Sequence, residues 1–400
     1  MSILFRILYI FEFLVFGYFL YVSTYNLLLS FFGLFKSGIE TTDSDVFNEV
    51  LILIPAYKED SVIFDSVEHA LSLNYPNKNF RVLVIADSFK EETIKRLRTF
   101  PVDLHIVTLN ESTKVKAIQS ALKKIRFEYS IMVILDADNI IDKDFLLKAN
   151  SLFIQGFKIV QGSRVIKNPV NHLAILDDLS EQINTHINRK GVCNAGGSSS
   201  ISGSGFAVDY QLGTEVFNSL NSIGGFDKEF EIALLRRGYK AIFYDGLFVF
   251  DEKVENNSVF KKQRTRWIAS QYSFLRKYLK RGFLALFNGN FVLFNSVVLR
   301  NIQLPRLLNL GLFSIALMLS LVLQEYFYIK FLYWCILYLL FLISILIAIP
   351  KRFYNFRMLL SIMQLPGIFL SMLIIMLNLK GANKRFIHTP HGSGTNSNEK

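Results

Sequence analysis

The chain has 400 residues, of which 51% are hydrophobic, and its mean hydropathy is +0.33. This composition argues against a wholly soluble protein, and the 19% of charged residues indicate a water-soluble domain joined to membrane spans. The net charge of +11 is typical of the cytoplasmic flanks of membrane helices, and no basic cluster interleaved with aromatic residues indicates nucleic-acid binding. Cys193 and Cys335 cannot form a disulfide framework and lack the spacing of a metal site.

Residues 3–35 form an almost wholly apolar run at the start of the chain. The run is too long for the core of a signal peptide, and no small-residue cleavage site follows it. We therefore predict a retained membrane anchor within residues 1–36. The polar residues 36–49 that follow are typical of a linker.

From Val50 onward, short apolar runs alternate with helix-like stretches. The strand-like runs are 50–54, 81–86, 104–108 and 131–135. This alternation predicts an α/β domain over residues 48–270 that contains a parallel sheet. Because ligands bind beyond the carboxyl ends of parallel strands, we expect Asp87, Asp136 and Asp138 to lie at a binding site.

Basic and apolar positions mix at helical spacing over residues 270–285. This pattern predicts that 271–304 forms helices lying on the cytoplasmic face of a membrane. The segment 305–380 then contains three apolar runs, each long enough to cross a bilayer. These runs are 305–324, 326–349 and 358–379, and a polar tail, 381–400, ends the chain.

The side of the membrane on which the tail lies is not decided by the sequence. Lys351 and Arg352 place the loop after the second run in the cytosol, and a third crossing would then put the tail outside. Lys380 and Lys384 instead favour the inside. A re-entrant run, or entry of residues 289–304 into the bilayer, would reconcile the two.

Two carboxylates, Asp136 and Asp138, lie one residue apart at the end of an apolar strand in the sequence LDADN. Mg²⁺ prefers oxygen ligands and is usually held by few carboxylates together with substrate phosphates. Such a cation would offset the charge that develops on a leaving diphosphate. Two aspartates with this spacing also occur in solvent-exposed turns after strands, so the motif does not establish the function by itself.

Acidic residues also begin the helix predicted within residues 224–246. Glu229 and Glu231 lie in its first turns, where a carboxylate can act as a general base. The simpler explanation is that they complement the helix dipole. In the same way, helix capping explains Asp87 when that residue is considered alone.

The most specific pattern is KKQRTRW, residues 261–267. Gln263, Arg266 and Trp267 follow the spacing i, i+3, i+4 and so share one face of a helix. An arginine can bind phosphate through two hydrogen bonds, and a tryptophan offers an apolar wall for a sugar ring. A basic, aromatic helix at a membrane interface would look similar.

The order of these motifs along one chain resembles the membrane-bound family 2 glycosyltransferases, which include cellulose, hyaluronan and chitin-oligosaccharide synthases and ceramide glucosyltransferases. The resemblance covers about residues 48–270, and the flanking apolar runs agree with it. It implies a GT-A fold, a Rossmann-like catalytic domain with transmembrane helices at both ends. It also implies a Mg²⁺ or Mn²⁺ cofactor and a nucleotide-sugar donor, most simply a UDP-sugar.

The resemblance also implies roles for individual residues. Asp136 and Asp138 match the metal-binding DxD motif, and Gln263, Arg266 and Trp267 match QxxRW, which lines the acceptor and diphosphate region. The donor-binding residues implied are Pro55, Tyr57, Glu59, Asp87, Lys114 and Asp136. The acceptor-binding residues implied are Gly203, Ser204, Gly205 and Trp267.

One position departs from the family. Members of the family usually have the residues Glu-Asp before the catalytic helix, and the Asp is the base. In this chain the aligned pair is Lys228-Glu229. The base is then Asp227, Glu229 or Glu231, and we select Glu229. The expected reaction is an inverting single displacement in which the acceptor hydroxyl is deprotonated as it attacks the sugar.

The expected product is a growing polysaccharide or oligosaccharide, and the alternatives are a single transfer to a lipid acceptor or an inactive nucleotide-binding membrane protein. The expected location is the inner or plasma membrane, in several passes, with the catalytic domain in the cytosol. Membrane lipids are expected partners. The one N-terminal and three C-terminal spans expected here are few for a full polymer channel. Such a channel would require a homo-oligomer or accessory subunits.

Overall fold

The central element of the fold is a mixed eight-stranded sheet. The computed structural model describes residues 3–109, 112–167, 171–222, 224–253 and 256–377. The strand order is β3-β2-β1-β4-β7-β6-β8-β5. The strands are β1 (Val50–Tyr57), β2 (Phe80–Asp87), β3 (Asp103–Ile106), β4 (Ile131–Ile134), β5 (Ile140–Ile141), β6 (Ile159–Ile166), β7 (Phe206–Asp209) and β8 (Ile242–Asp251).

The four strands expected from the sequence, β1 to β4, form the parallel half of the sheet. The other half is not purely parallel, because β7 runs antiparallel to both β4 and β6. The predicted α/β class is therefore confirmed, and the sheet is mixed rather than wholly parallel. Since all four parallel strands point the same way, the turns after them meet at one edge.

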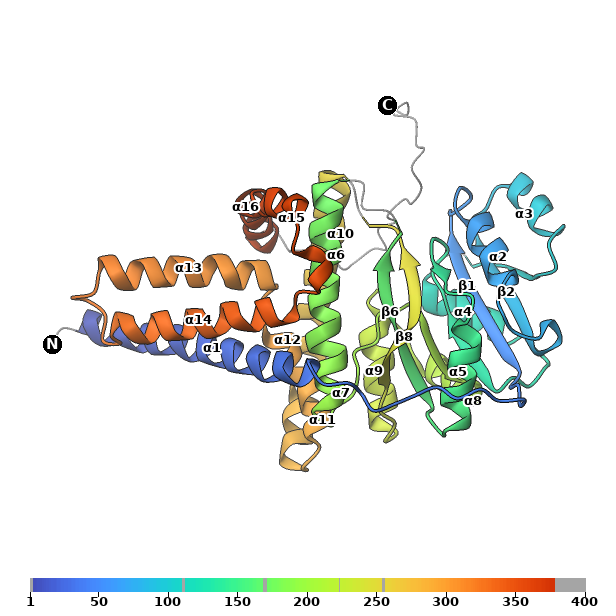
Figure 1. Cartoon of the computed structure of the whole chain (residues 1–400), viewed down its shortest axis with the longest axis horizontal. Helices are drawn as coiled ribbons and strands as arrows, with labels where there is room; N and C mark the ends of the chain where they lie inside the picture. Colours follow the sequence, from blue (N-terminus) through green and yellow to red (C-terminus); the bar gives the residue numbers. More distant parts are fainter. Residues whose placement is uncertain (1–2, 110–111, 168–170, 223, 254–255, 378–400) are drawn as a thin grey trace.

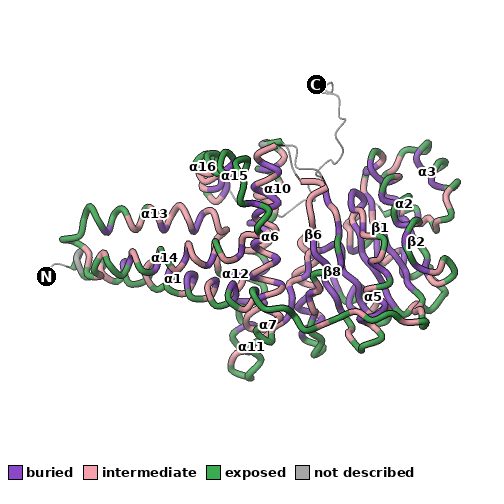
Figure 2. The backbone as a smooth tube through the Cα atoms, viewed as in Figure 1, coloured by how far each residue is buried: buried purple, intermediate pink, exposed green. Residues whose placement is uncertain are grey.

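Helices cover both faces of the sheet, as Figure 1 shows. Alternate residues of β1 supply the two cores: Val50, Ile52 and Ile54 pack on one side, and Leu51 and Leu53 on the other. The first core is closed by α2 (Ile63–Leu71), α3 (Glu91–Leu97) and α5 (Phe145–Ile154). The second is closed by α4 (Lys114–Leu122), α8 (Tyr210–Ser219) and α9 (Phe226–Arg236). Figure 2 shows the strands buried between these layers.

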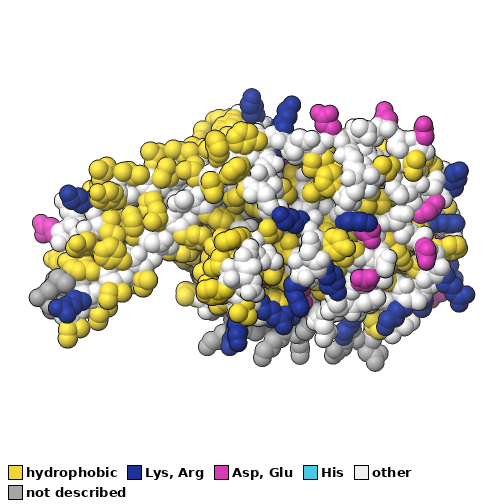
Figure 3. Space-filling view, turned by 90° about the horizontal axis from the view of Figure 1, so that it is seen from below, with side chains coloured by type: hydrophobic (Ala, Val, Ile, Leu, Met, Phe, Trp, Pro, Cys, Tyr) yellow, Lys and Arg dark blue, Asp and Glu magenta, His cyan; other side chains and the backbone are white. Residues whose placement is uncertain are grey.

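An apolar three-helix bundle projects from this domain (Figure 1). It consists of α1 (Ile3–Gly33), α13 (Arg306–Val322) and α14 (Phe331–Ala348). Phe19 of α1 stacks on Phe313 of α13 with ring centroids 4.1 Å apart. Figure 3 shows hydrophobic side chains covering much of the bundle's surface, whereas most charged side chains lie on the catalytic domain. This distribution is typical of membrane-spanning helices.

Among the described residues, α1 and α14 are each long and apolar enough to cross a membrane. Two bent pairs of helices raise the number of candidate spans to four if each pair is one span. In the first pair, the segment Phe291–Ile302, which holds α11 (Phe291–Phe294) and α12 (Arg300–Ile302), meets α13 at 59°. In the second, α15 (Phe356–Ile362) meets α16 (Leu365–Leu377) at 43°.

Two long helices lie across the bundle axis where the bundle meets the domain (Figure 1). They are α6 (His172–Thr185), which continues through a π-helical turn, His186–Gly191, into α7 (Val192–Asn194), and α10 (Asn257–Phe287). The interfacial helix expected at 270–285 is the second half of α10, and its first half carries Gln263 and Trp267.

The run expected at 358–379 does not continue the bundle. In Figure 1, α15 and α16 are seen nearly end-on, whereas α1, α13 and α14 lie in the plane of the picture. His172 of α6 and Ser361 of α15 are 2.9 Å apart. Arg352, in the turn before α15, pairs with Asp178 of α6 at 2.9 Å. The bend between α15 and α16 is compatible with either a broken span or a re-entrant loop, and the contacts with α6 favour the re-entrant alternative.

This arrangement gives a topology prediction. With the α/β domain in the cytosol, as expected from the sequence, a fluorescent reporter fused to the C-terminus should fold and fluoresce there, because the contacts of this segment with α6 favour a re-entrant pair over a third crossing. A periplasmic phosphatase fused at the same point should be inactive. The matched control is a fusion in the loop between α13 and α14, after Glu325, which should give the opposite pattern. Phosphatase activity from the C-terminal fusion would contradict this topology.

Candidate active site

Acidic side chains follow three neighbouring parallel strands. Asp87 ends β2, Glu59 follows β1, and Asp136 and Asp138 follow β4, so the turns meet at one edge of the sheet as expected. Asp138 is only 5% exposed. Burial, followed by the charges of Asp138 and Asp136, raises the pKa of Glu59 to about 8. This crowding of carboxylates at a parallel-sheet edge fits a divalent cation, which would relieve their repulsion.

The two carboxylates of the DxD motif are the ones best placed for such a cation. Within the described ranges, no three acidic, histidine or cysteine side chains are arranged to hold a metal ion by themselves. Asp136 and Asp138 would therefore share the cation with oxygens of the donor diphosphate, the way in which Mg²⁺ is commonly held.

Lys114 connects the metal-site carboxylates to the loop that precedes β7. Its ammonium group pairs with Asp136 and donates a 3.0 Å hydrogen bond to the carbonyl of Gly203. The same group lies 5.1 Å from the ring of Phe226, at the start of α9. The donor-side lysine expected from the sequence thus lies between Asp136 and the predicted acceptor loop. Tyr57 and Pro55 lie in the last part of β1, beside this edge.

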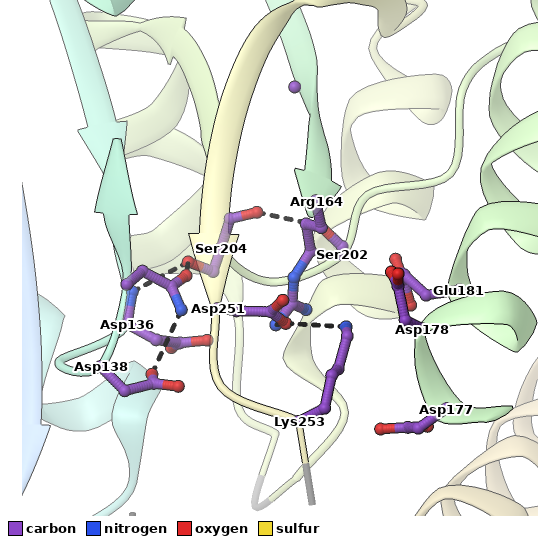
Figure 4. A network of polar contacts seen from close by, with 12 residues as sticks. Asp136, Asp138, Arg164, Asp177, Asp178, Glu181, Ser202, Ser204, Asp251 and Lys253 are labelled. Carbon is purple, nitrogen blue, oxygen red and sulfur yellow. Dashed lines mark hydrogen bonds and ion pairs between the residues drawn. The ribbon is translucent and has the colours of Figure 1, made fainter. Parts of the chain in front are cut away.

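The acceptor loop, Ser202–Gly205, is tied to the DxD turn by hydrogen bonds (Figure 4). The backbone N–H of Asp136 donates to the Ser204 hydroxyl at 2.8 Å, and that hydroxyl donates to the side chain of Asn139. From β6, Gln161 donates to the carbonyls of Ser204 and Gly205 and accepts from the N–H of Ser202 at 2.9 Å. The position of this loop and the position of Asp136 are therefore linked.

Gly205 shows why a glycine is needed in this loop. Its φ is +67°, and a Cβ there would meet Cγ2 of Val249 at 2.5 Å. Gly205→Ala should lower stability by about 2 kcal/mol, because it adds both backbone strain and a clash. Thermal unfolding of the detergent-purified chain should show a fall of several degrees. Gly156→Ala is the control, because the φ of Gly156 is +94° but no atom lies within 4 Å of a Cβ added there. If the unfolding temperatures of both variants fall equally, the clash with Val249 contributes nothing.

At the start of α9, two of the three acidic residues considered as the base lie in ion pairs. Glu229 pairs with Lys277 of α10 at 2.6 Å and lines an outer cavity of about 380 Å³ with Arg236. Glu231 is 2% exposed, and both its oxygens accept from Arg300 at 2.8 Å. Both of these carboxylates are therefore held in ion pairs.

Asp227, the remaining alternative, lies on the site's side of α9. Residues two apart on a helix point about 200° apart, so Asp227 and Glu229 cannot share a face. A Cβ on Gly203 would lie 3.6 Å from the Cβ of Asp227. The charge of Asp227 also acts on the guanidinium of Arg266. Asp227 thus lies next to the acceptor loop and to the QxxRW helix.

The QxxRW residues lie in the first half of α10. Burial lowers the pKa of Arg266, and the charges of Asp136 and Asp227 oppose that shift. The Oε1 atom of Gln263 is buried and has no hydrogen-bond partner among the described residues. Trp267 is 43% exposed, and Arg264 stacks on its ring at 4.5 Å. An exposed tryptophan beside an unpaired amide oxygen could contact a sugar.

Charged residues that the sequence analysis did not select also surround the site (Figure 4). Arg164 of β6 pairs with Asp251 at 2.6 Å, and Lys253 pairs with the same carboxylate at 3.0 Å. The Oδ1 atom of Asp251 is buried without a partner in the described part of the chain. No motif could identify these residues, because only the pairing of β6 with β8 brings them together.

Residues 48–270 match the family profile described as "Glycosyltransferase like family 2". The chain belongs to this glycosyltransferase family. Over 147 residues it is 26% identical to the poly-beta-1,6-N-acetyl-D-glucosamine synthase of Staphylococcus epidermidis strain RP62A. That match covers 34% of each chain, so about a third of the relative's length is spanned.

Solved structures show more distant likenesses to this family 2 glycosyltransferase. One is the mannosyltransferase PcManGT from Pyrobaculum calidifontis in complex with GDP-Man and Mn²⁺, at 16% identity and a TM-score of 0.49, over 80% of this chain and 94% of that one. Another is glucosyl-3-phosphoglycerate synthase from Mycobacterium tuberculosis in complex with Mn²⁺ and UDP-glucose, at 15% identity and a TM-score of 0.38, over 56% and 78%.

Proposed function

We propose that this enzyme transfers a sugar from a nucleotide-sugar donor to an acceptor at the cytosolic face of the membrane, with inversion at the anomeric carbon. The observation that carries the proposal is that Asp136, through Lys114, and Asp227 both lie beside Gly203, and that the charges of both act on Arg266. Asp136 can hold the donor, Asp227 can accept a proton, and Arg266 can stabilise the leaving group. The donor is most simply a UDP-sugar.

The donor would lie across the ends of β1, β2 and β4. Asp87 and Glu59 would accept hydrogen bonds from the ribose and base, as carboxylates at such strand ends can. Asp136 and Asp138 would hold a divalent cation, which supplies charge stabilisation for the departing diphosphate. Lys114 and Arg266 add fixed positive charge on either side of Asp136.

Asp227 is the proposed general base. Its carboxylate would take the proton from the acceptor hydroxyl as that oxygen forms a bond to the anomeric carbon. The bond between that carbon and the diphosphate oxygen breaks, and the nucleoside diphosphate leaves. The acceptor would approach over Trp267 and the loop Ser202–Gly205, opposite the diphosphate.

The acceptor is proposed to be a growing saccharide or a lipid, and the catalytic domain to face the cytosol of a cell with its helices in the inner or plasma membrane. The name of the Staphylococcus epidermidis relative supports a saccharide product. The small number of spans, two to four in the described residues, supports a lipid-borne acceptor, since a polymer channel would need further helices or subunits.

The direct test is release of nucleoside diphosphate by the purified full-length chain. With a panel of UDP- and GDP-sugars, one donor should be hydrolysed or transferred, and chelation should stop the release. Labelled product from the same reaction should then be separated into organic-soluble and polymeric fractions. No release with any donor, while nucleotide binding persists, would support the inactive alternative instead.

A further inference from the structure

Two arginines at the junction between the catalytic domain and the bundle have different surroundings. Arg300 of α12 donates to both carboxylate oxygens of Glu231 at 2.8 Å. Arg306, the first residue of α13, donates to the amide oxygen of Asn184 at 2.9 Å. Among the residues that the structure describes, no carboxylate lies within ion-pair distance of Arg306. Arg300 is therefore neutralised and Arg306 is not.

The charges around the junction do not balance. The cations Lys228, Arg266 and Arg300 share the carboxylates Asp227 and Glu231, while Asp136 is already paired with Lys114, so none of these carboxylates is left for Arg306. Lys228 is held by an uncharged group, the side chain of Asn301, at 2.5 Å. Burial, and then the charge of Arg300, lowers the pKa of Lys228 to about 8. A cation excess at the foot of an apolar bundle is costly unless an anion joins it.

Arg306 lies between the apolar bundle and the acceptor loop. Leu308, two residues along α13, packs with Ile268 of α10 and with α16. On the other side, Asn184 belongs to α6, and the backbone carbonyl of Asn188, one turn further, accepts from the N–H of Ser200 at 3.2 Å. Ser200 leads directly into the loop at Ser202–Gly205. A molecule with an apolar tail beside α13 could therefore place its polar end next to this loop.

We propose that Arg306, together with Asn184, binds the phosphate of a lipid acceptor that already carries sugars, one of whose hydroxyls is the nucleophile. This inference rests on the proposed function and specifies its acceptor class. A guanidinium binds a phosphate through paired hydrogen bonds, and Arg306 has donors to spare for this. A neutral glycolipid or a free polysaccharide would leave the guanidinium without an anion.

The test is binding of a polyprenyl phosphate to the full-length chain in a phosphate-free detergent, measured by native mass spectrometry. The matching polyprenol should bind at least about tenfold more weakly, because it lacks the anion. Arg306→Gln should lose at least about tenfold in affinity, and Arg306→Lys should recover part of the loss. The control is Arg357→Gln on α15, which removes an exposed positive charge near the same face and should bind like wild type.

Two results would overturn the inference: unchanged affinity in Arg306→Gln, or equal binding of polyprenol. Displacement by an equimolar amount of phosphatidylglycerol would also overturn it, since the site would then accept any phospholipid headgroup. Arg306→Gln should unfold at the same temperature as wild type and bind the donor nucleotide equally well, which shows that it folds. If wild type releases none with any donor, the proposed function fails, whereas the binding comparison can still succeed or fail independently.

Discussion

Replacing Asp227 by Asn should reduce sugar transfer by about a thousandfold, because positioned general bases contribute 10²–10⁴-fold. The substitution keeps the size of the side chain and removes its basicity. Asp227 lies beside Gly203 and its charge reaches Arg266, whereas neither of the other acidic residues of α9 is free. The measurement is the initial rate of labelled product, with donor affinity determined separately by nucleotide titration. Donor affinity should change little.

Glu229→Gln is the matched control for Asp227→Asn. The sequence alone favoured Glu229 as the base, but its carboxylate pairs with Lys277, on the outer side of α9. Its loss removes one partly exposed ion pair, worth about 1 kcal/mol or less, so transfer should stay within about threefold of wild type. If Glu229→Gln abolishes transfer while Asp227→Asn remains active, the assignment of the base to Asp227 is wrong.

Replacing Asp138 by Asn should reduce transfer by about a hundredfold or more. The buried carboxylate would lose its charge, and a cation that supplies several kcal/mol of stabilisation to the leaving diphosphate would bind poorly. In wild type, chelation should stop transfer and added Mn²⁺ or Mg²⁺ should restore it. In Asp138→Asn, far higher metal concentrations should be needed, which a metal titration of the transfer rate would measure.

Asp142→Asn is the control for Asp138→Asn. Asp142 lies four residues further along the same segment and pairs with Lys148 at 3.1 Å, at a partly exposed position. Its removal should leave both the transfer rate and the metal dependence within about twofold of wild type. Full activity of Asp138→Asn in the presence of chelator would show that transfer needs no cation at this carboxylate.

The parallel half of the sheet could be predicted because each of its strands is a short, buried apolar run that ends at a turn. The antiparallel insertion of β7 could not, since Phe206–Asp209 is a short segment whose partners, β4 and β6, are distant in sequence. The same is true of Arg164 and Asp251, which meet only through strand pairing. Local patterns determine elements, whereas long-range packing determines their neighbours.

The face of α9 could have been deduced from its apolar residues. Phe226, Phe230 and Leu234 follow the spacing i, i+4, i+8 and are buried against the sheet. With this buried face fixed, Asp227 and Glu229 lie on opposite sides of the helix. The sequence analysis considered only their charge, and by that criterion the two residues are equivalent. Similarly, Pro366, in the second position of α16, signals the break that separates α15 from α16.

The helix that carries the QxxRW motif has a practical consequence for work with the isolated domain. The family match ends at residue 270, but α10 continues without a break to Phe287. Several residues of α10 after residue 270 hold it in place. Phe274 and Tyr278 pack with Val297 and Ile232. The side chain of Gln271 donates hydrogen bonds to the carbonyls of Asn301 and Gln303. A fragment cut at 270 would thus end in mid-helix and expose an apolar seam. Crystallisation or screening should use the chain through α16, because the helix that carries the QxxRW motif is anchored by residues outside the range of the family match.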